Sequence, residues 1–224
     1  MRIGVIQASS QRGMNAALYR GVQEAVRRNG RGDTVINYGV TEDENLSCSY
    51  VETAVSISLL LESGTVDFVV TGCTSGQGMM LACNSLPSVM CGFAGNPEDA
   101  YFFGRINHGN ALSLPLGRCG GWMGTYALQC TLDRLFEGEF GCGYPPEDAA
   151  RRKGDALRVR ELMDITRRSL PEVLRRCDRT WVRHVLERQR VWEDVLVYGQ
   201  NREMIELIRK MRCGEERTGA RDPE

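Results

Sequence analysis

Residues 66–80, VDFVVTGCTSGQGMM, join an apolar run to a glycine-rich turn and then to a segment that begins with two methionines. The run TVDFVVTG is short and rich in β-branched residues, which predicts a buried strand. The segment that follows, GQGMMLACNSL, has the apolar spacing of a helix. A strand that leads through a tight turn into a helix is the repeating unit of a parallel α/β sheet.

The same alternation of strand and helix extends over the first 150 residues. It predicts a Rossmann-like three-layer α/β/α sandwich with a parallel sheet in residues 1–150. Ligands of such sheets bind outside the carboxyl ends of the strands. The other strand-like runs are RIGVIQA, DTVINYGV, SVMCGFA and NALSLPLG, and the helix-like segments between and after them are GMNAALYRGVQEAVRRNG, SYVETAVSISLLLESG, PEDAYFFGRINHG and GGWMGTYALQCTLDRLFEG.

The composition changes near Pro145, where the chain becomes charged and rich in arginine. This predicts a C-terminal helical extension over residues 151–212 and a disordered tail over residues 213–224. Most of the arginines are interpreted as a solvated face. We expect one apolar face of the extension to pack against the main domain or a partner subunit. The apolar positions at helical spacing are Leu157, Leu162, Ile165, Leu170, Val173 and Leu174.

The overall composition favours small-molecule chemistry over nucleic-acid or membrane partners. The 224 residues carry a formal net charge of -1, so no global basic field attracts nucleic acid or an anionic membrane. The longest apolar runs fall well short of the roughly 20 residues that span a bilayer. The N-terminus lacks the features of a signal peptide, so we expect a cytoplasmic location.

The cysteine and histidine content predicts free thiols and no metal site. The nine cysteines are odd in number and form no Cys-x-x-Cys pair. The only histidines are His108 and His184, and neither lies close to a cysteine along the chain in the spacing of a zinc site.

The turn CTSGQG, residues 73–78, is suited to holding an anion because it exposes backbone N–H groups at a helix N-terminus. It matches neither a P-loop nor a dinucleotide fingerprint, so nucleotide binding is not supported. Cys73 is expected to face the helix N-terminus, a position that favours the thiolate form. From the local sequence two interpretations stay equally open: a catalytic thiolate, or a small buried thiol.

Residues 66–110 resemble the ribose-5-phosphate isomerase B and galactose-6-phosphate isomerase family. The positions that agree without a gap are Val66, Asp67, Cys73, Gly76, Gly78, Asn84, Pro97, Asn107, Asn110 and, just beyond, Leu112. The resemblance implies an aldose–ketose isomerase that acts through an enediolate without metal or organic cofactor. The implied substrate is a small sugar phosphate, such as ribose 5-phosphate, ribulose 5-phosphate or a compound like galactose 6-phosphate.

The resemblance also implies roles for individual residues. Cys73 is the base that moves a proton between two carbons, Tyr50 contacts the substrate, and Asn107 lies near the reacting oxygens. A packing residue at a helix start is the alternative for Tyr50, and a turn residue is the alternative for Asn107. The cradle for the enediolate oxygens is the backbone of Thr74, Ser75, Gly76, Gln77 and Gly78.

Two loops depart from the family pattern. Where the family has an Asp-His pair after the first strand, this chain has Ala8, Ser9 and Ser10. Ser9, Ser10 and Arg12 are predicted to bind a polar substrate, with Arg12 as a candidate phosphate ligand, and a merely solvated loop is the alternative. Ile106 occupies the place of the ring-opening histidine. His108, two residues on, is the candidate replacement, and a helix-end or surface histidine is the alternative.

The phosphate-binding arginines of the family lie on the C-terminal helix and often reach the partner subunit's site. The matching segment, ARRKGDALRVREL, offers Arg151, Arg152, Arg158 and Arg160, of which Arg152 and Arg158 are our candidates. We therefore predict a cofactor-free isomerase that forms a homodimer or homotetramer, with the identity of the sugar left open. The alternatives are a related proton-transfer enzyme acting on a small hydroxy-carbonyl compound, and a non-catalytic protein that binds a phosphorylated sugar.

Overall fold

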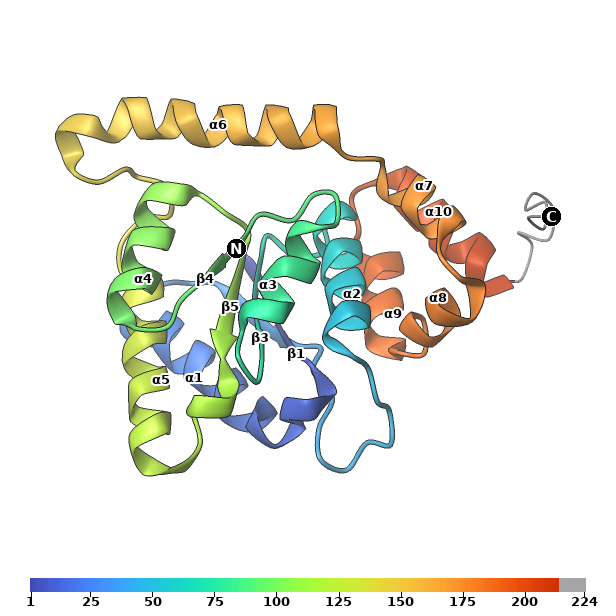
Figure 1. The fold of residues 1–224 in the computed structure, drawn as a ribbon, viewed down its shortest axis with the longest axis horizontal. Helices are drawn as coiled ribbons and strands as arrows, with labels where there is room; N and C mark the ends of the chain where they lie inside the picture. The colour runs from blue at the N-terminus through green and yellow to red at the C-terminus, as the bar shows by residue number, and fades with distance from the viewer. Residues whose placement is uncertain (214–224) are drawn as a thin grey trace.

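The computed structural model of the chain describes residues 1–213 and contains a five-stranded sheet in which all strands are parallel (Figure 1). The strand order is β2-β1-β3-β5-β4, so the order along the sheet reverses between β1 and β3. The predicted Rossmann-like sandwich is confirmed. The strands are β1 Arg2–Gln7, β2 Thr34–Asn37, β3 Phe68–Cys73, β4 Cys91–Phe93 and β5 Ala111–Pro115.

Helices cover both faces of the sheet because successive strand residues point to opposite sides. Val5 and Val70 belong to the core beneath one group of helices, whereas the neighbouring residues Ile6 and Val69 belong to the core on the opposite face. The first group is α1 Asn15–Arg28, α4 Pro97–Phe102 and α5 Gly121–Leu135. The second is α2 Tyr50–Glu62 and α3 Gln77–Asn84.

Four helices of the C-terminal extension pack beside α2 (Figure 1). Leu170, Val182, Val195 and Met204 are buried in the same core cluster as the apolar residues of α2 and α3, so this part of the extension shares the core of the sandwich. These helices are α7 Leu170–Arg176, α8 Arg179–Val185, α9 Gln189–Tyr198 and α10 Arg202–Cys213. The predicted disordered tail lies outside the described residues, apart from residue 213.

The remaining helix of the extension, α6 Ala149–Thr166, runs along one edge of the molecule (Figure 1), and several of its apolar side chains are exposed. Leu157, Leu162 and Ile165 are 58%, 60% and 79% exposed. Leu170 and Leu174 of α7, in contrast, are buried. The apolar positions that predicted a packing face thus divide into a buried set on α7 and an unpartnered set on α6.

Two further predictions concern the membrane and the thiols. In the part of the chain that the structure describes, no helix is long and apolar enough to cross a bilayer. The eight cysteines whose side chains are described are all free.

Candidate active site

The carboxyl ends of β3 and β5 lie beside the point where the strand order reverses. Cys73 is the last residue of β3, and its register partner is Pro115, the last residue of β5. The loops that follow are joined directly, because the Gly117 N–H donates to the Thr74 carbonyl at 3.0 Å. The Cys73 side chain is 7% exposed. The fold therefore places this thiol at the carboxyl edge of the sheet, beside the reversal of strand order, where sheets of this kind bind ligands.

The turn after Cys73 ends at Gly76, directly before α3. The backbone conformation and the close neighbours at this position require glycine. Gly76 has a φ of +75°, and a Cβ added there would lie 2.8 Å from the Leu114 carbonyl carbon and from the Phe93 ring. The Ser113 hydroxyl donates to the Gly76 carbonyl at 2.7 Å and fixes the turn. No side chain of the described residues caps the N-terminus of α3. Its first N–H groups are therefore open to an anionic ligand.

The other predicted cradle residues surround this terminus. Thr74, Ser75 and Gln77 are exposed, and Gly78 is half-buried in the first turn of α3. The Gln11 side-chain amide donates to the Thr74 hydroxyl at 3.0 Å, which links the turn to the loop after β1. Residues 74–78 thus follow directly on Cys73, and all of them except Gly76 reach the surface.

The loop after β1 uses two of its predicted substrate ligands to hold the main chain. The buried Ser9 hydroxyl accepts the Cys48 N–H at 2.7 Å. The Arg12 guanidinium donates to the carbonyls of Ser9, Glu44 and Leu46 at 3.2, 2.8 and 3.2 Å. These contacts tie the loop after β1 to the loop before α2. Ser10, the third predicted substrate ligand in this loop, is exposed at the carboxyl edge of the sheet.

Tyr50 lies against the turn after β3. It is the first residue of α2, and a Cβ added to Gly78 would lie 3.5 Å from a Tyr50 ring carbon. The ring is 43% exposed and lines a cavity of about 380 Å³ together with Trp181 of α8. Tyr50 is therefore next to the predicted cradle, and the C-terminal extension supplies part of the wall beside it.

Asn107 and His108 lie at the opposite edge of the sheet from Cys73. Both precede β5, which begins at Ala111, and Ala111 is the register partner of Val69 at the start of β3. The four-residue rise from Val69 to Cys73 separates the two edges by about 13 Å. β5 accordingly points away from α6 in Figure 1. Within one chain these two residues and Cys73 do not share a site.

The surroundings of His108 favour the neutral imidazole. Partial burial and the nearby charges of Arg160 and Lys153 lower the pKa of His108 below its usual value. Arg160 also donates to the His108 carbonyl at 3.0 Å. A neutral imidazole at neutral pH can both accept and donate a proton.

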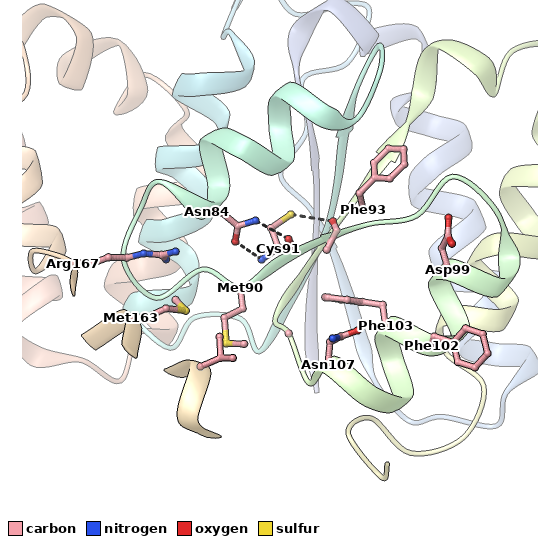
Figure 2. A pocket seen from close by; sticks show the side chains of 13 residues that line it. Asn84, Met90, Cys91, Phe93, Asp99, Phe102, Phe103, Asn107, Met163 and Arg167 are labelled. Carbon is pink, nitrogen blue, oxygen red and sulfur yellow. Dashed lines mark hydrogen bonds between the residues drawn. The ribbon is translucent and has the colours of Figure 1, made fainter. Parts of the chain in front are cut away.

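The candidate arginines of α6 lie at this same edge as His108. Arg152 is 3.8 Å from Asp148, and Arg158 is 3.5 Å from Asp155. Arg158 is exposed and Arg152 is partly buried, and neither of these long contacts is a strong ion pair, so the guanidinium groups are available to another anion. Figure 2 shows a neighbouring pocket of about 510 Å³ beneath α6. Its wall contains Asn107, Phe103, Met163 and Arg167, and Asn84 at its rim holds the Cys91 backbone through two hydrogen bonds.

A family model described as "Ribose/Galactose Isomerase" matches residues 6–138. The chain belongs to the ribose/galactose isomerase family. The matched segment contains the whole sheet from the end of β1 onward and includes Cys73, the 74–78 turn, Asn107 and His108. No curated protein gives a significant match.

Two solved structures are similar to the chain over nearly its whole length. A 4-deoxy-L-threo-5-hexosulose-uronate ketol-isomerase complexed with a tartrate is 36% identical, with a TM-score of 0.88, over 95% of this chain and 100% of that one. Ribose-5-phosphate isomerase LacAB_rpiB from Vibrio parahaemolyticus is 32% identical, with a TM-score of 0.87, over 94% and 99%. The type B ribose 5-phosphate isomerase from Trypanosoma cruzi, 18% identical with a TM-score of 0.60, covers 73% of this chain and shares its fold.

These similarities show that the chain is a sugar isomerase of the aldose–ketose type. The first two structures cover most of the C-terminal helices as well as the sandwich, whereas the Trypanosoma cruzi enzyme leaves about a quarter of the chain unmatched. The extension is therefore shared with these two solved structures and is not peculiar to this chain.

Two residues at the Cys73 edge were missed by the sequence analysis. Gln11 contacts the Thr74 hydroxyl, as described above, and Arg118 ends the short helical turn that follows β5. Arg118 is exposed, and no hydrogen bond or ion pair joins its guanidinium to another described residue. The signal was present in the sequence, because a basic residue directly after the run NALSLPLG had to lie at the carboxyl edge of the sheet.

Proposed function

We propose that the protein interconverts an aldose and a ketose carrying an anionic group, through an enediolate intermediate with Cys73 as the base. The observation that carries this proposal is the position of the Cys73 thiol. It ends a central strand at the point where the strand order reverses, directly before a helix N-terminus that no described side chain caps.

The chemistry requires a base and a set of donors aimed at developing negative charge. The Cys73 thiolate takes the proton from the carbon next to the carbonyl, and the electrons of that C–H bond form the carbon–carbon double bond of the enediolate. The N–H groups of residues 75–78 stabilise the charge that develops on the oxygen. The thiol then returns its proton to the adjacent carbon, so no net proton or electron is consumed.

A second group has to move a proton between the two oxygens of the enediolate. The His108 side chain of the same subunit cannot do so, because it lies at the edge of the sheet opposite to Cys73. We propose that the functional unit is a homodimer in which His108 and Asn107 of the partner subunit complete the Cys73 site. The apolar residues Leu157, Leu162 and Ile165, exposed on α6 beside the His108 edge, support an interface at that edge. In this arrangement the α6 arginines also approach the partner's substrate.

The substrate's anionic group is expected to bind arginine. Arg118 stands beside the 74–78 turn, and no described residue pairs with its guanidinium; Arg152 and Arg158 would approach from the partner subunit. A phosphate and a carboxylate both suit a guanidinium fork. The two solved structures that are similar over nearly the whole chain are a hexosulose-uronate ketol-isomerase and a ribose-5-phosphate isomerase.

A sugar acid is the second candidate substrate, and one position in the sequence favours it. Ile106 stands where the resemblance places a ring-opening histidine. An apolar side chain cannot transfer the proton that opens a sugar ring. Unless His108 takes over that step, an open-chain substrate therefore fits this site better than a cyclic one.

Solvent deuterium exchange tests the isomerase directly. The protein is incubated in D₂O with ribose 5-phosphate, galactose 6-phosphate and 4-deoxy-L-threo-5-hexosulose uronate, and deuterium incorporation next to the carbonyl is followed by NMR. We expect incorporation with at least one compound. Removal of the base in Cys73→Ala should lower the rate by about 10²- to 10⁴-fold.

Cys130→Ser is the matched control, since Cys130 is a half-buried free thiol on α5, which packs on the opposite face of the sheet from α3. It should exchange at the wild-type rate. Exchange that survives Cys73→Ala unchanged would refute the assignment of the base. Binding of these sugars without any exchange would instead favour the non-catalytic binding protein.

A further inference from the structure

A cluster of three metal-binding side chains lies between α2 and α8, outside the Cys73 site. Cys48 precedes α2, Glu52 is in its first turn, and His184 is in the last turn of α8. The thiol sulfur, a carboxylate oxygen and an imidazole nitrogen all lie within 4.8 Å of one another. His184 Nδ1 is 2.5 Å from Glu52 Oε1. Cys48 and Glu52 are buried, while His184 is 35% exposed.

We propose that Cys48, Glu52 and His184 form a zinc site. A thiolate, an imidazole and a carboxylate are the donors that Zn²⁺ prefers in proteins. Ligand atoms around a tetrahedral zinc lie about 3–4 Å apart, given bond lengths of about 2.0–2.3 Å. Small side-chain adjustments are therefore enough to enclose the ion, with water as the fourth ligand through the exposed side of His184.

The neighbouring groups orient each ligand for this role. The Ser49 N–H holds Glu52 Oε2 at 2.7 Å, which leaves Oε1, the oxygen facing His184, for the ion. His184 Nε2 lies 3.6 Å from a carboxylate oxygen of Glu187. A metal-bound histidine commonly donates its other N–H to a carboxylate in this way. The Cys48 N–H is held by the Ser9 hydroxyl, which fixes the backbone of the third ligand.

The charges around the cluster also suit a bound dication. The Cys48 thiolate and the Glu52 carboxylate together supply two negative charges, and binding releases the thiol proton to solvent. Arg188 is 4% exposed, donates to the Tyr38 carbonyl and the Thr53 hydroxyl, and leaves its buried Nε–H without a partner among the described residues. Its hydrogen bond to Thr53, the residue after Glu52, places it next to the cluster. An N–H donor next to a metal thiolate stabilises the bound form.

Such a site would fasten the C-terminal extension to the sandwich beside the proposed substrate site. α8 carries both His184 and Trp181, and Trp181 lines the cavity next to Tyr50. Zinc between α2 and α8 would therefore hold this wall of the cavity in place. The zinc site does not depend on the proposed reaction, because its ligands are separate from Cys73 and the 74–78 turn.

Metal analysis of the full chain tests the site. Untagged wild-type protein, expressed with added zinc and desalted, should contain about one zinc per chain. After chelation, Co²⁺ should restore an ultraviolet thiolate-to-cobalt charge-transfer band together with visible bands of tetrahedral cobalt. Cys48→Ser and His184→Gln should lose the bound zinc, and Cys48→Ser should also lose the charge-transfer band.

The matched controls come from the same part of the fold. Cys177→Ser removes another thiol of the extension, and Glu193→Gln removes a carboxylate of α9 that is hydrogen-bonded only to Gln189 among the contacts described. Both should bind zinc like the wild type. Wild-type protein without zinc and without a cobalt band would overturn the proposal, and so would a cobalt band that persists in Cys48→Ser. The wild-type spectrum decides the question even where a ligand variant fails to fold.

Discussion

At the scale of single residues, the Cys73 site depends on a glycine as much as on the thiol. Gly76 combines a left-handed backbone with contacts to Leu114 and Phe93 that leave no room for a Cβ. A non-glycine residue in this conformation costs about 1–3 kcal/mol, and the contacts add to that cost. We expect Gly76→Ala to lower the free energy of unfolding in urea by at least this amount and to reduce turnover by displacing the N-terminus of α3.

Gly154→Ala is the comparison for that measurement. Gly154 lies inside α6, and an added Cβ there meets no atom within 4 Å. The substitution should stabilise the chain by about 0.5–1 kcal/mol, because alanine loses less backbone entropy in a helix. Equal effects of the two substitutions would show that the turn tolerates a side chain and is not a fixed cradle.

The residues of the site also show which chemistry can be deduced from sequence. Cys73 follows a run whose composition predicts a strand, so its place at the carboxyl edge was predictable. Asn107 and His108 precede the next strand, and residues before a parallel strand lie at the edge opposite to residues after it. The resemblance grouped them with Cys73 in one active site but could not say which subunit supplies them.

At the scale of elements, the periodicity of the sequence predicted strands and helices but not their partners. The regular apolar spacing in residues 157–174 is the same on both sides of the break near residue 168, yet α7 is buried and α6 is exposed. Apolar periodicity indicates that one face of a helix is buried, but it does not indicate which element or subunit buries that face. The exposed apolar face of α6 is therefore one that a partner could cover.

Introducing charge on that face tests whether a second subunit covers it. Leu162→Glu combined with Ile165→Glu places two carboxylates where an apolar contact is proposed. A buried unpaired charge costs several kcal/mol, so the dimer dissociation constant should rise by at least about 100-fold. Sedimentation velocity across a concentration series measures the change, and circular dichroism verifies that the helices remain.

The matching control is Val197→Glu, which changes an apolar residue of similar exposure, 69%, on α9. It should leave the sedimentation coefficient unchanged. A wild-type chain that sediments as a monomer at all concentrations would contradict the proposed interface, as would a double variant that remains dimeric.

At the scale of the whole molecule, the packing of the C-terminal extension against the sandwich is the feature that was hardest to predict from the sequence. Glu52 and His184 are 132 residues apart, and they meet because α8 packs against α2. No local spacing rule detects such a pair, which is why the sequence predicted no metal site. The sheet, in contrast, could be predicted, because it is built from consecutive strand–helix units whose connections are short and right-handed.

The proposed active site also combines residues that are not neighbours in the sequence, in this case residues of two different subunits. If Cys73 of one subunit works with His108 of the partner subunit, two inactive variants should restore each other. Cys73→Ala and His108→Gln are unfolded together, refolded together and assayed for the exchange reaction. In a random mixture half of the dimers are mixed, and each mixed dimer contains one intact site and one doubly altered site. About a quarter of the wild-type activity should therefore return, as expected for a two-fold symmetric dimer. Each variant refolded alone supplies the baseline. A site built within one chain would give a mixture no more active than the average of the two variants.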